Sequence, residues 1–140
     1  MLGKIFDSPA SVLLNKSMDV ASLRNTVTAN NIANNNTPDF KRREVIFEDK
    51  LQDTLLANHK PLNMRITNNR HILIHSNHNL VNMEPEIQEM NDLSFRNDGN
   101  NVDIDVESAK LAKNKIYYDS LTQSLSNEFR LLRLAITGRG

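Results

Sequence analysis

The chain lacks cysteine and tryptophan, and its 140 residues include only four glycines, four prolines and two tyrosines. Without cysteine there is no disulfide framework, thiol nucleophile or thiolate metal site. At this length, with 39% hydrophobic residues and few aromatic side chains, the chain can form one domain at most, with a modest core. A core this small is typical of a subunit whose fold is completed by its neighbours.

An excess of one charge and long apolar runs are also missing. The 17 basic residues balance 17 acidic ones, and Lys41–Arg43 is too short a basic run to matter, so we expect neither nucleic acid nor an anionic membrane as a partner. No stretch approaches the roughly 18 apolar residues that span a bilayer. Residues 1–7 contain no uninterrupted apolar segment of a signal peptide. We therefore expect no membrane insertion and no export by the general secretory route.

The first regular feature is an apolar periodicity over residues 8–36. Its seven-residue repeat consists of Leu13, Val20 and Val27. This spacing predicts an amphipathic helix with a coiled-coil tendency. Ser8 and Pro9 fit the cap and the first turn. Three consecutive asparagines and then Pro38, which disfavours helical geometry in the residue before it, predict the end of this helix.

A second seven-residue repeat is unbroken in the C-terminal part of the chain. It consists of Ile104, Leu111, Tyr118, Leu125 and Leu132. The repeat predicts a helix whose apolar stripe must be buried against another helix. Asp103 or Asp105 can cap its first amides, and Gly138 can end it. Pairing with the first helix gives an antiparallel hairpin that leaves apolar surface for further helices.

The segment between the helices mixes short apolar bursts, at Val45–Phe47 and His71–Ile74, with Asn, Pro and His. These patterns favour extended pieces and loop, with room for one short β-hairpin. The predicted fold class is therefore all-α: two long terminal helices forming an antiparallel coiled-coil hairpin, with an extended, irregular middle segment. We divide the chain into residues 1–43, 44–100 and 101–140.

The sequence offers weak candidates for chemistry. His71, His75 and His78 would share one face of a helix, as metal ligands require, but the residues among them favour a strand and then a turn. The segment Asp98–Asp105 is rich in oxygen ligands yet lacks the order of a calcium loop, so a turn leading into a helix cap is favoured. No carboxylate pair, Ser/His/Asp set or glycine-rich phosphate loop appears. We expect no metal, no cofactor and no enzyme activity.

One motif has a specific resemblance. Asn31–Arg42 stands as NIANNNTPDFKR, which resembles the flagellar basal-body rod family, whose subunits carry N-I-A-N-x-x-T-P-G-[YF]-K-R near the N-terminus. The short length, Met64–Ile72 and Arg96–Asp105 resemble the proximal-rod subunits rather than the longer distal-rod or hook proteins. Asp39 replaces the family's glycine. A glycine there suggests a positive φ, which aspartate also visits, so the turn is expected to be kept at some cost.

The resemblance implies a structural subunit of the rod that self-assembles through its terminal helices, transmits torque and lines the export channel. Implied partners are other rod subunits, the membrane-ring and export-gate complex, and rod-base proteins. The implied route is the flagellar type III export apparatus, without a cleaved signal peptide, to an extracytoplasmic place in the basal body. The alternative from another class is a soluble helical-hairpin adaptor that binds a partner helix in the cytoplasm.

Two sets of residues are predicted to carry assembly. The junction set is Asn31, Ile32, Asn34, Thr37, Pro38 and Phe40, and the seam set is Leu111, Tyr118, Leu125 and Leu132. Asn31 and Asn34 could fix helix register between subunits or could fray the helix end, and the family motif favours the first interpretation. The aromatic residues at helical spacing are expected to pack rather than to form a binding site.

Overall fold

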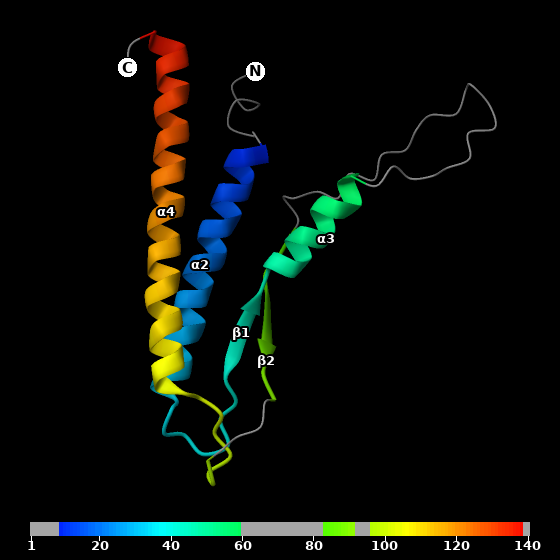
Figure 1. Ribbon diagram of the computed structural model, residues 1–140, viewed down its shortest axis with the longest axis vertical. Coiled ribbons are helices and arrows are strands. Elements are labelled where there is room, and N and C mark those ends of the chain that lie inside the picture. The colour runs from blue at the N-terminus through cyan, green and yellow to red at the C-terminus, as the bar shows by residue number, and fades with distance from the viewer. Residues whose placement is uncertain (1–8, 60–82, 92–95, 139–140) are drawn as a thin grey trace, which may run out of the picture.

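The structure is a computed structural model that describes residues 9–59, 83–91 and 96–138. Helix α2, Pro9–Ala33, and helix α4, Ile104–Thr137, run antiparallel and pack side by side (Figure 1). Strand β1, Arg43–Ile46, helix α3, Glu48–His59, and strand β2, Glu86–Glu89, lie between them in the chain. The predicted fold class, a hairpin of two long terminal helices, is confirmed.

Both predicted ends of α4 are confirmed. Asp103 is the N-cap, and its side chain accepts hydrogen bonds from the backbone amides of Asp105 at 2.9 Å and Val106 at 3.2 Å. Gly138 ends the helix in the left-handed conformation, with φ of 64°, and its amide donates to the carbonyl of Leu134 at 2.8 Å. A side-chain acceptor and a positive-φ glycine satisfy groups that every helix end leaves free.

The seam of α4 against α2 has two rows of residues that alternate in steps of four and three, as in a coiled coil. The row predicted from the sequence holds Leu111, Tyr118, Leu125 and Leu132. The other row holds Glu107, Asn114, Leu121 and Glu128. All eight are buried or half-buried except Tyr118, which is 38% exposed. Ile104, the first residue of the predicted repeat, is 46% exposed at the start of the helix.

The second row is mostly polar, and its side chains fix the pairing of the two helices. The Asn114 side-chain amide donates to the backbone carbonyl of Ala21 at 2.7 Å, and the Ser11 hydroxyl donates to Glu128 at 2.6 Å. A slip of either helix along the other would leave these half-buried groups without partners, which is costly. Polar contacts of this kind specify one register of a helix pair.

Strands β1 and β2 form a two-stranded antiparallel sheet beside α2, with β1 next to the helices and β2 on the outer side (Figure 1). The buried cluster between sheet and helix consists of Val20, Val27, Val45 and Phe47. Two valines of the predicted repeat on α2 therefore pack against β1, and the other buried α2 residues are small or polar. The extended conformation predicted around Val45 is confirmed.

Helix α3 was not predicted: the middle segment was expected to be extended or irregular, with room for one short β-hairpin. The 12 residues of α3 begin with Glu48 and Asp49, which favour a helix N-terminus, and Leu51 packs against the buried cluster. Glu48 and Lys50 add ion pairs with Arg24 of α2 and Glu86 of β2. A helix this short and polar has little apolar periodicity for sequence analysis to detect. The second apolar burst, His71–Ile74, and the histidines at 71, 75 and 78 lie outside the described residues.

Within the described ranges, no helix has both the length and the apolar character needed to cross a membrane.

Candidate assembly site

The amide of Asn31 joins three elements at the end of α2. Asn31 is fully buried, and its side chain donates to the Arg43 carbonyl at 2.8 Å and accepts from the Arg43 amide at 3.0 Å. These are the bonds that a neighbouring strand would make with the free edge of β1. The same Asn31 nitrogen donates to Glu107 of α4 at 2.8 Å. One side chain therefore holds α2, β1 and α4 together.

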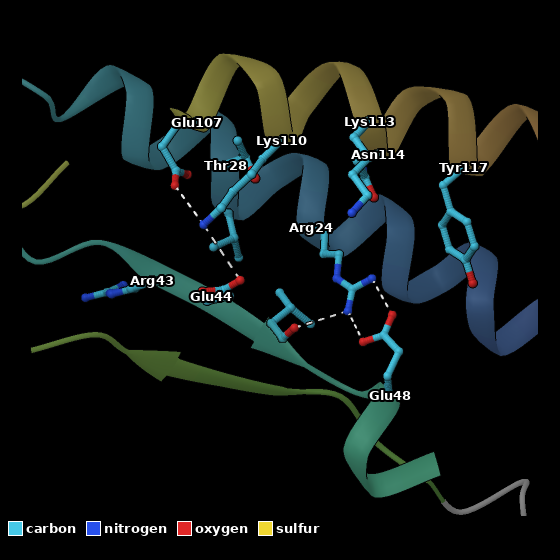
Figure 2. Close-up of a pocket in the computed structure, with 12 residues that line it drawn as sticks. Arg24, Thr28, Arg43, Glu44, Glu48, Glu107, Lys110, Lys113, Asn114 and Tyr117 are labelled. Carbon is cyan, nitrogen blue, oxygen red and sulfur yellow. Dashed lines mark hydrogen bonds and ion pairs between the residues drawn. The ribbon is translucent and has the colours of Figure 1, made fainter. Parts of the chain in front are cut away.

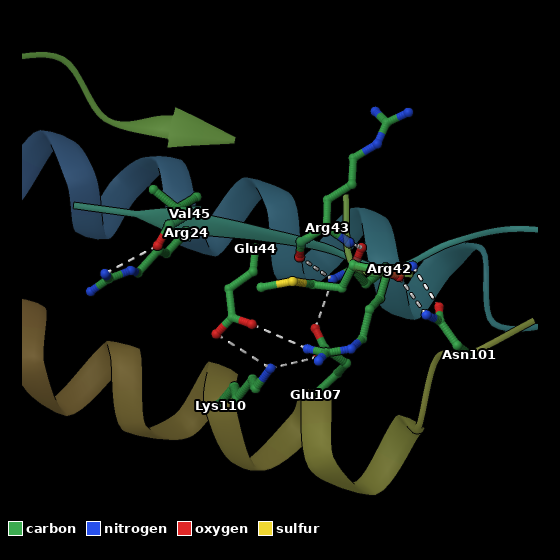
Figure 3. Close-up of polar contacts among 10 residues, drawn as sticks. Arg24, Arg42, Arg43, Glu44, Val45, Asn101, Glu107 and Lys110 are labelled. Atoms are coloured by element: carbon green, nitrogen blue, oxygen red, sulfur yellow. Dashed lines mark hydrogen bonds and ion pairs between the residues drawn. The ribbon is translucent and has the colours of Figure 1, made fainter. Parts of the chain in front are cut away.

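Glu107 is a buried carboxylate, 2% exposed, and its charge is balanced at the junction. Lys110 lies 3.2 Å from one Glu107 oxygen and 3.7 Å from Glu44 of β1 (Figure 3). A buried carboxylate is tolerated only when it is paired and hydrogen-bonded, as Glu107 is by Lys110 and Asn31. Removing Lys110 would leave an uncompensated charge in the contact between α2 and α4, and removing Asn31 would leave a buried carboxylate oxygen without its hydrogen bond.

Asn100 caps the end of α2 from a distant part of the chain. It is fully buried, and its side-chain nitrogen lies 2.9–3.0 Å from the carbonyls of Asn34, Asn35 and Thr37. Its side-chain oxygen accepts from the Val102 amide at 2.7 Å. Carbonyls at the end of a helix have no partner within that helix. Asn100 supplies one and thereby ties the turn after α2 to the turn before α4.

We expect Asn100→Ala to destabilise the fold by about 2–3 kcal/mol, because buried carbonyls and the Val102 amide lose their partner. The measurement is the free energy of unfolding of the purified chain in urea, followed by circular dichroism. Asn97→Ala, at an exposed position in the same turn, is the matched control. Equal stability of the two variants would contradict the capping role.

The positive φ predicted at Asp39 is confirmed: the angle is 60°. The Asp39 amide donates to the carbonyl of Asp98 at 2.8 Å, so this turn faces the one before α4. Gly99, with φ of 72°, lies against it, and a Cβ at Gly99 would come within 2.6 Å of the Asp39 carboxylate. The two turns are therefore packed together, and a larger residue at position 99 would be strained by the positive φ and would displace the Asp39 carboxylate.

The structure gathers the predicted junction residues around this turn and places the seam residues along α4. In chain order the junction set comprises buried Asn31, half-buried Ile32 and Asn34, exposed Thr37 and Pro38, and half-buried Phe40. The role of both sets in assembly stays a prediction. Asn100 and Glu107 were missed, since apolar periodicity contains no signal for polar residues that pair across the fold. The motif around Asn31 was the one hint of a buried polar contact.

A groove of about 460 Å³ opens between α4, α2 and β1 (Figure 2). Val27 and Val45, both nearly buried, line it, together with the half-exposed ring of Tyr117. Lys110 and Lys113 of α4 add positive charge to the same groove. The groove therefore combines apolar surface with a basic wall.

Arg24 and Glu48 close one end of this groove (Figure 2). Arg24 donates to Glu48 at 2.7 Å and to the Val45 carbonyl at 3.3 Å. This hydrogen-bonded pair raises the pKa of Arg24 and lowers the pKa of Glu48. The Arg24–Glu48 pair therefore stabilises the fold fully at pH values above the unfolded-state pKa of Glu48. This stabilisation is lost as pH falls through the lower pKa that Glu48 has in the folded state. The Glu48 side chain is 58% exposed, so that contribution is small.

The fold and the site define a class of protein, a helical structural subunit whose terminal helices pair through a polar and apolar seam. Comparison with known proteins identifies it further. The chain is 36% identical to the flagellar basal body rod protein FlgB of Borrelia hermsii over 89% of its length and 93% of that relative. It is 32% identical to FlgB of Borreliella burgdorferi, over 85% of the chain and 89% of the relative. It is 31% identical to FlgB of Bacillus subtilis, over 89% of the chain and 91% of that relative.

The chain therefore belongs to the FlgB family of flagellar basal body rod proteins. No protein-family model matches the chain. The resemblance drawn from the motif at Asn31–Arg42 is confirmed, and the alternative of a cytoplasmic adaptor is not favoured. The names of these relatives describe a protein of the flagellar basal body rod.

Proposed function

We propose that the protein builds the proximal part of the flagellar rod by polymerising through its paired terminal helices. In that position it would transmit torque and line the export channel, and it would catalyse no reaction. Membership of the FlgB family supports the rod as the destination. The helical hairpin supplies a stiff element along which load can pass.

The end of α4 is the observation that carries this proposal. Apolar side chains cover several sides of its last turns and remain exposed in the single chain. They are Phe129 (48%), Leu131 (59%), Leu134 (44%) and Ile136 (74%). A helix that is apolar on all sides is normally buried. Exposed apolar patches on an otherwise polar subunit mark contacts with other proteins. We infer that neighbouring subunits surround this end of α4 in the rod.

The partners follow from that place in the assembly. They are other rod subunits above, with the membrane-ring and export-gate complex and rod-base proteins below. The protein would reach the basal body through the flagellar type III export apparatus, without a cleaved signal peptide. Residues 1–43 and 101–140 would form the assembling helices, and residues 44–100 would lie at the surface of the hairpin, where part of the segment would contact neighbouring subunits.

The test removes apolar surface that the single chain does not bury. We expect the double variant Leu131→Asn/Ile136→Asn to keep the helix content of the purified chain, because both side chains are more than half exposed. In cells, the variant should reduce swimming at least tenfold, since each buried apolar side chain contributes about 1.5–3 kcal/mol to an interface. Leu56→Asn, 54% exposed on α3, is the matched control and should swim normally.

Normal swimming by the double variant would contradict assembly through the end of α4. Loss of swimming by the Leu56→Asn control alone would place the essential contacts on α3 instead.

A further inference from the structure

The groove between α4, α2 and β1 contains Lys113, which forms no ion pair within the described residues, although its charge acts on Glu48 from a longer range. Glu44 and Glu107 are paired with Lys110, and Glu48 is paired with Arg24. Lys113 makes no hydrogen bond or ion pair with any side chain in the described ranges, although it lines the same groove (Figure 2). The apolar side chains of Val27, Val45 and Tyr117 line the same groove. A bound segment should therefore offer one acidic and one apolar side chain.

The groove is large enough to take such a segment. Its volume of about 460 Å³ lies within the roughly 300–1,000 Å³ of natural binding pockets. Val27 and Val45 are 9% and 4% exposed, so they form an apolar floor, and Tyr117, at 39%, forms an apolar rim. Apolar surface together with the positive charge of Lys113 favours a peptide segment over a small inorganic anion, because such an anion would leave the apolar surface in water.

Strand β2 carries the complementary side chains. Ile87 is 47% exposed, and Glu89, two residues further, lies on the same face of the strand at a spacing of about 6.6 Å. Glu89 makes no ion pair within the described residues, even though Arg43 is its cross-strand neighbour. Glu84 and Glu86 extend the acidic character of this segment, and Glu86 also pairs with Lys50.

The β2 strand cannot reach the groove of its own chain. β1 lies between β2 and the helices, and it is held on one edge by β2 and on the other by Asn31 of α2 (Figures 1 and 2). A contact between the two surfaces must therefore join different copies. Because the two surfaces differ, the contact is head-to-tail, and repeated head-to-tail contacts generate rings or open helical assemblies.

We propose that the groove of one subunit binds β2 of the next copy, with Ile87 against Val27, Val45 and Tyr117 and with Glu89 paired to Lys113. This inference rests on the proposed self-assembly, and it names the surfaces that would meet outside the helical seam. It assigns the exposed strand of the middle segment a role in fixing the angle between successive copies.

The first test reverses the charges. We expect Lys113→Glu and Glu89→Lys each to reduce the number of rods per cell about tenfold, because a like-charge contact replaces an attractive one. The double variant Lys113→Glu/Glu89→Lys should restore rods, since the pair is re-formed with opposite signs. Lys115→Glu, exposed on the same helix outside the groove, is the matched control. Single variants without effect, or a double variant no better than the singles, would overturn the proposal.

The second test uses the absence of native cysteine. The variant Lys113→Cys/Glu89→Cys should form disulfide-linked dimers and longer ladders when basal bodies are oxidised, whereas Lys115→Cys/Glu89→Cys should form at least about tenfold fewer. Equal yields from both variants, or none from the first, would refute docking of β2 in the groove. If Lys113→Glu reduces the number of rods and Glu89→Lys does not, the groove binds another acidic protein. That result would also refute docking of β2 in the groove.

These results are separable from the proposed function. If the charge-reversal variants build normal numbers of rods and the cysteine variant forms no cross-link, while Leu125→Asp still abolishes the rod, only the docking of β2 is refuted. If a Leu125→Asp strain builds normal rods, assembly through the helical seam fails as well.

Discussion

Leu125→Asp is expected to abolish rod assembly and motility. Leu125 is half-buried in the seam of α4, one turn from the buried Leu121, and it faces α2 between polar contacts that fix the register. An aspartate there would place an unpaired charge in an apolar layer, at a cost of about 3 kcal/mol or more. Because small domains are stable by only about 5–15 kcal/mol, this loss removes a large share of the free energy that holds the two helices together.

The measurement for Leu125→Asp is the swimming of a strain in which the variant replaces the native gene, together with the helix content of the purified variant. Ser126→Asp is the matched control, because it adds the same charge to an exposed position one residue along the same helix. The control should swim normally. Normal motility of the Leu125→Asp strain would refute the role of the seam.

Asn31→Asp is expected to destabilise the chain by about 3–5 kcal/mol although the two side chains have nearly the same shape. The substitution replaces the nitrogen that donates to Glu107 and to the Arg43 carbonyl with an acceptor. Two carboxylates would then face each other in a buried site that holds one cation, Lys110. One of them must take up a proton or leave the junction, and either outcome lowers the stability of the contact between α2, β1 and α4.

The free energy of unfolding in urea measures this effect. Asn30→Asp is the control, since it adds the same charge one residue away on the exposed face of the same helix end, where the helix dipole disfavours both aspartates equally. Glu107→Gln should recover much of the loss in the Asn31→Asp background, because glutamine can donate to the new carboxylate. A loss no larger than that of the control would contradict the bridging role of Asn31.

Parts of this molecule follow directly from local patterns in its sequence. The bounds of α4 could be predicted because Asp103 and Gly138 act within one turn of the helix ends. The positive φ of Asp39 could be predicted from the glycine that the family motif has at that position. One row of the seam could be predicted because its residues repeat at intervals of seven. They are Leu111, Tyr118, Leu125 and Leu132.

Other parts depend on contacts between distant residues. Glu107 and Asn100 are polar and appear in the sequence as ordinary surface residues, yet both are buried through partners more than 60 positions away. Helix α3 is too short and polar for its periodicity to stand out, and it is held by Leu51 against the buried cluster. The pairing of β1 with β2 joins strands separated by 39 residues, and no tight turn marks it in the sequence.

The most direct test of the rod assignment is an in-frame deletion of the gene, imaged by cryo-electron tomography of the intact cell envelope beside a complemented strain. A subunit of the proximal rod predicts membrane rings without a rod in the deletion strain, and complete basal bodies after complementation. A complete rod and hook in the deletion strain would contradict the assignment.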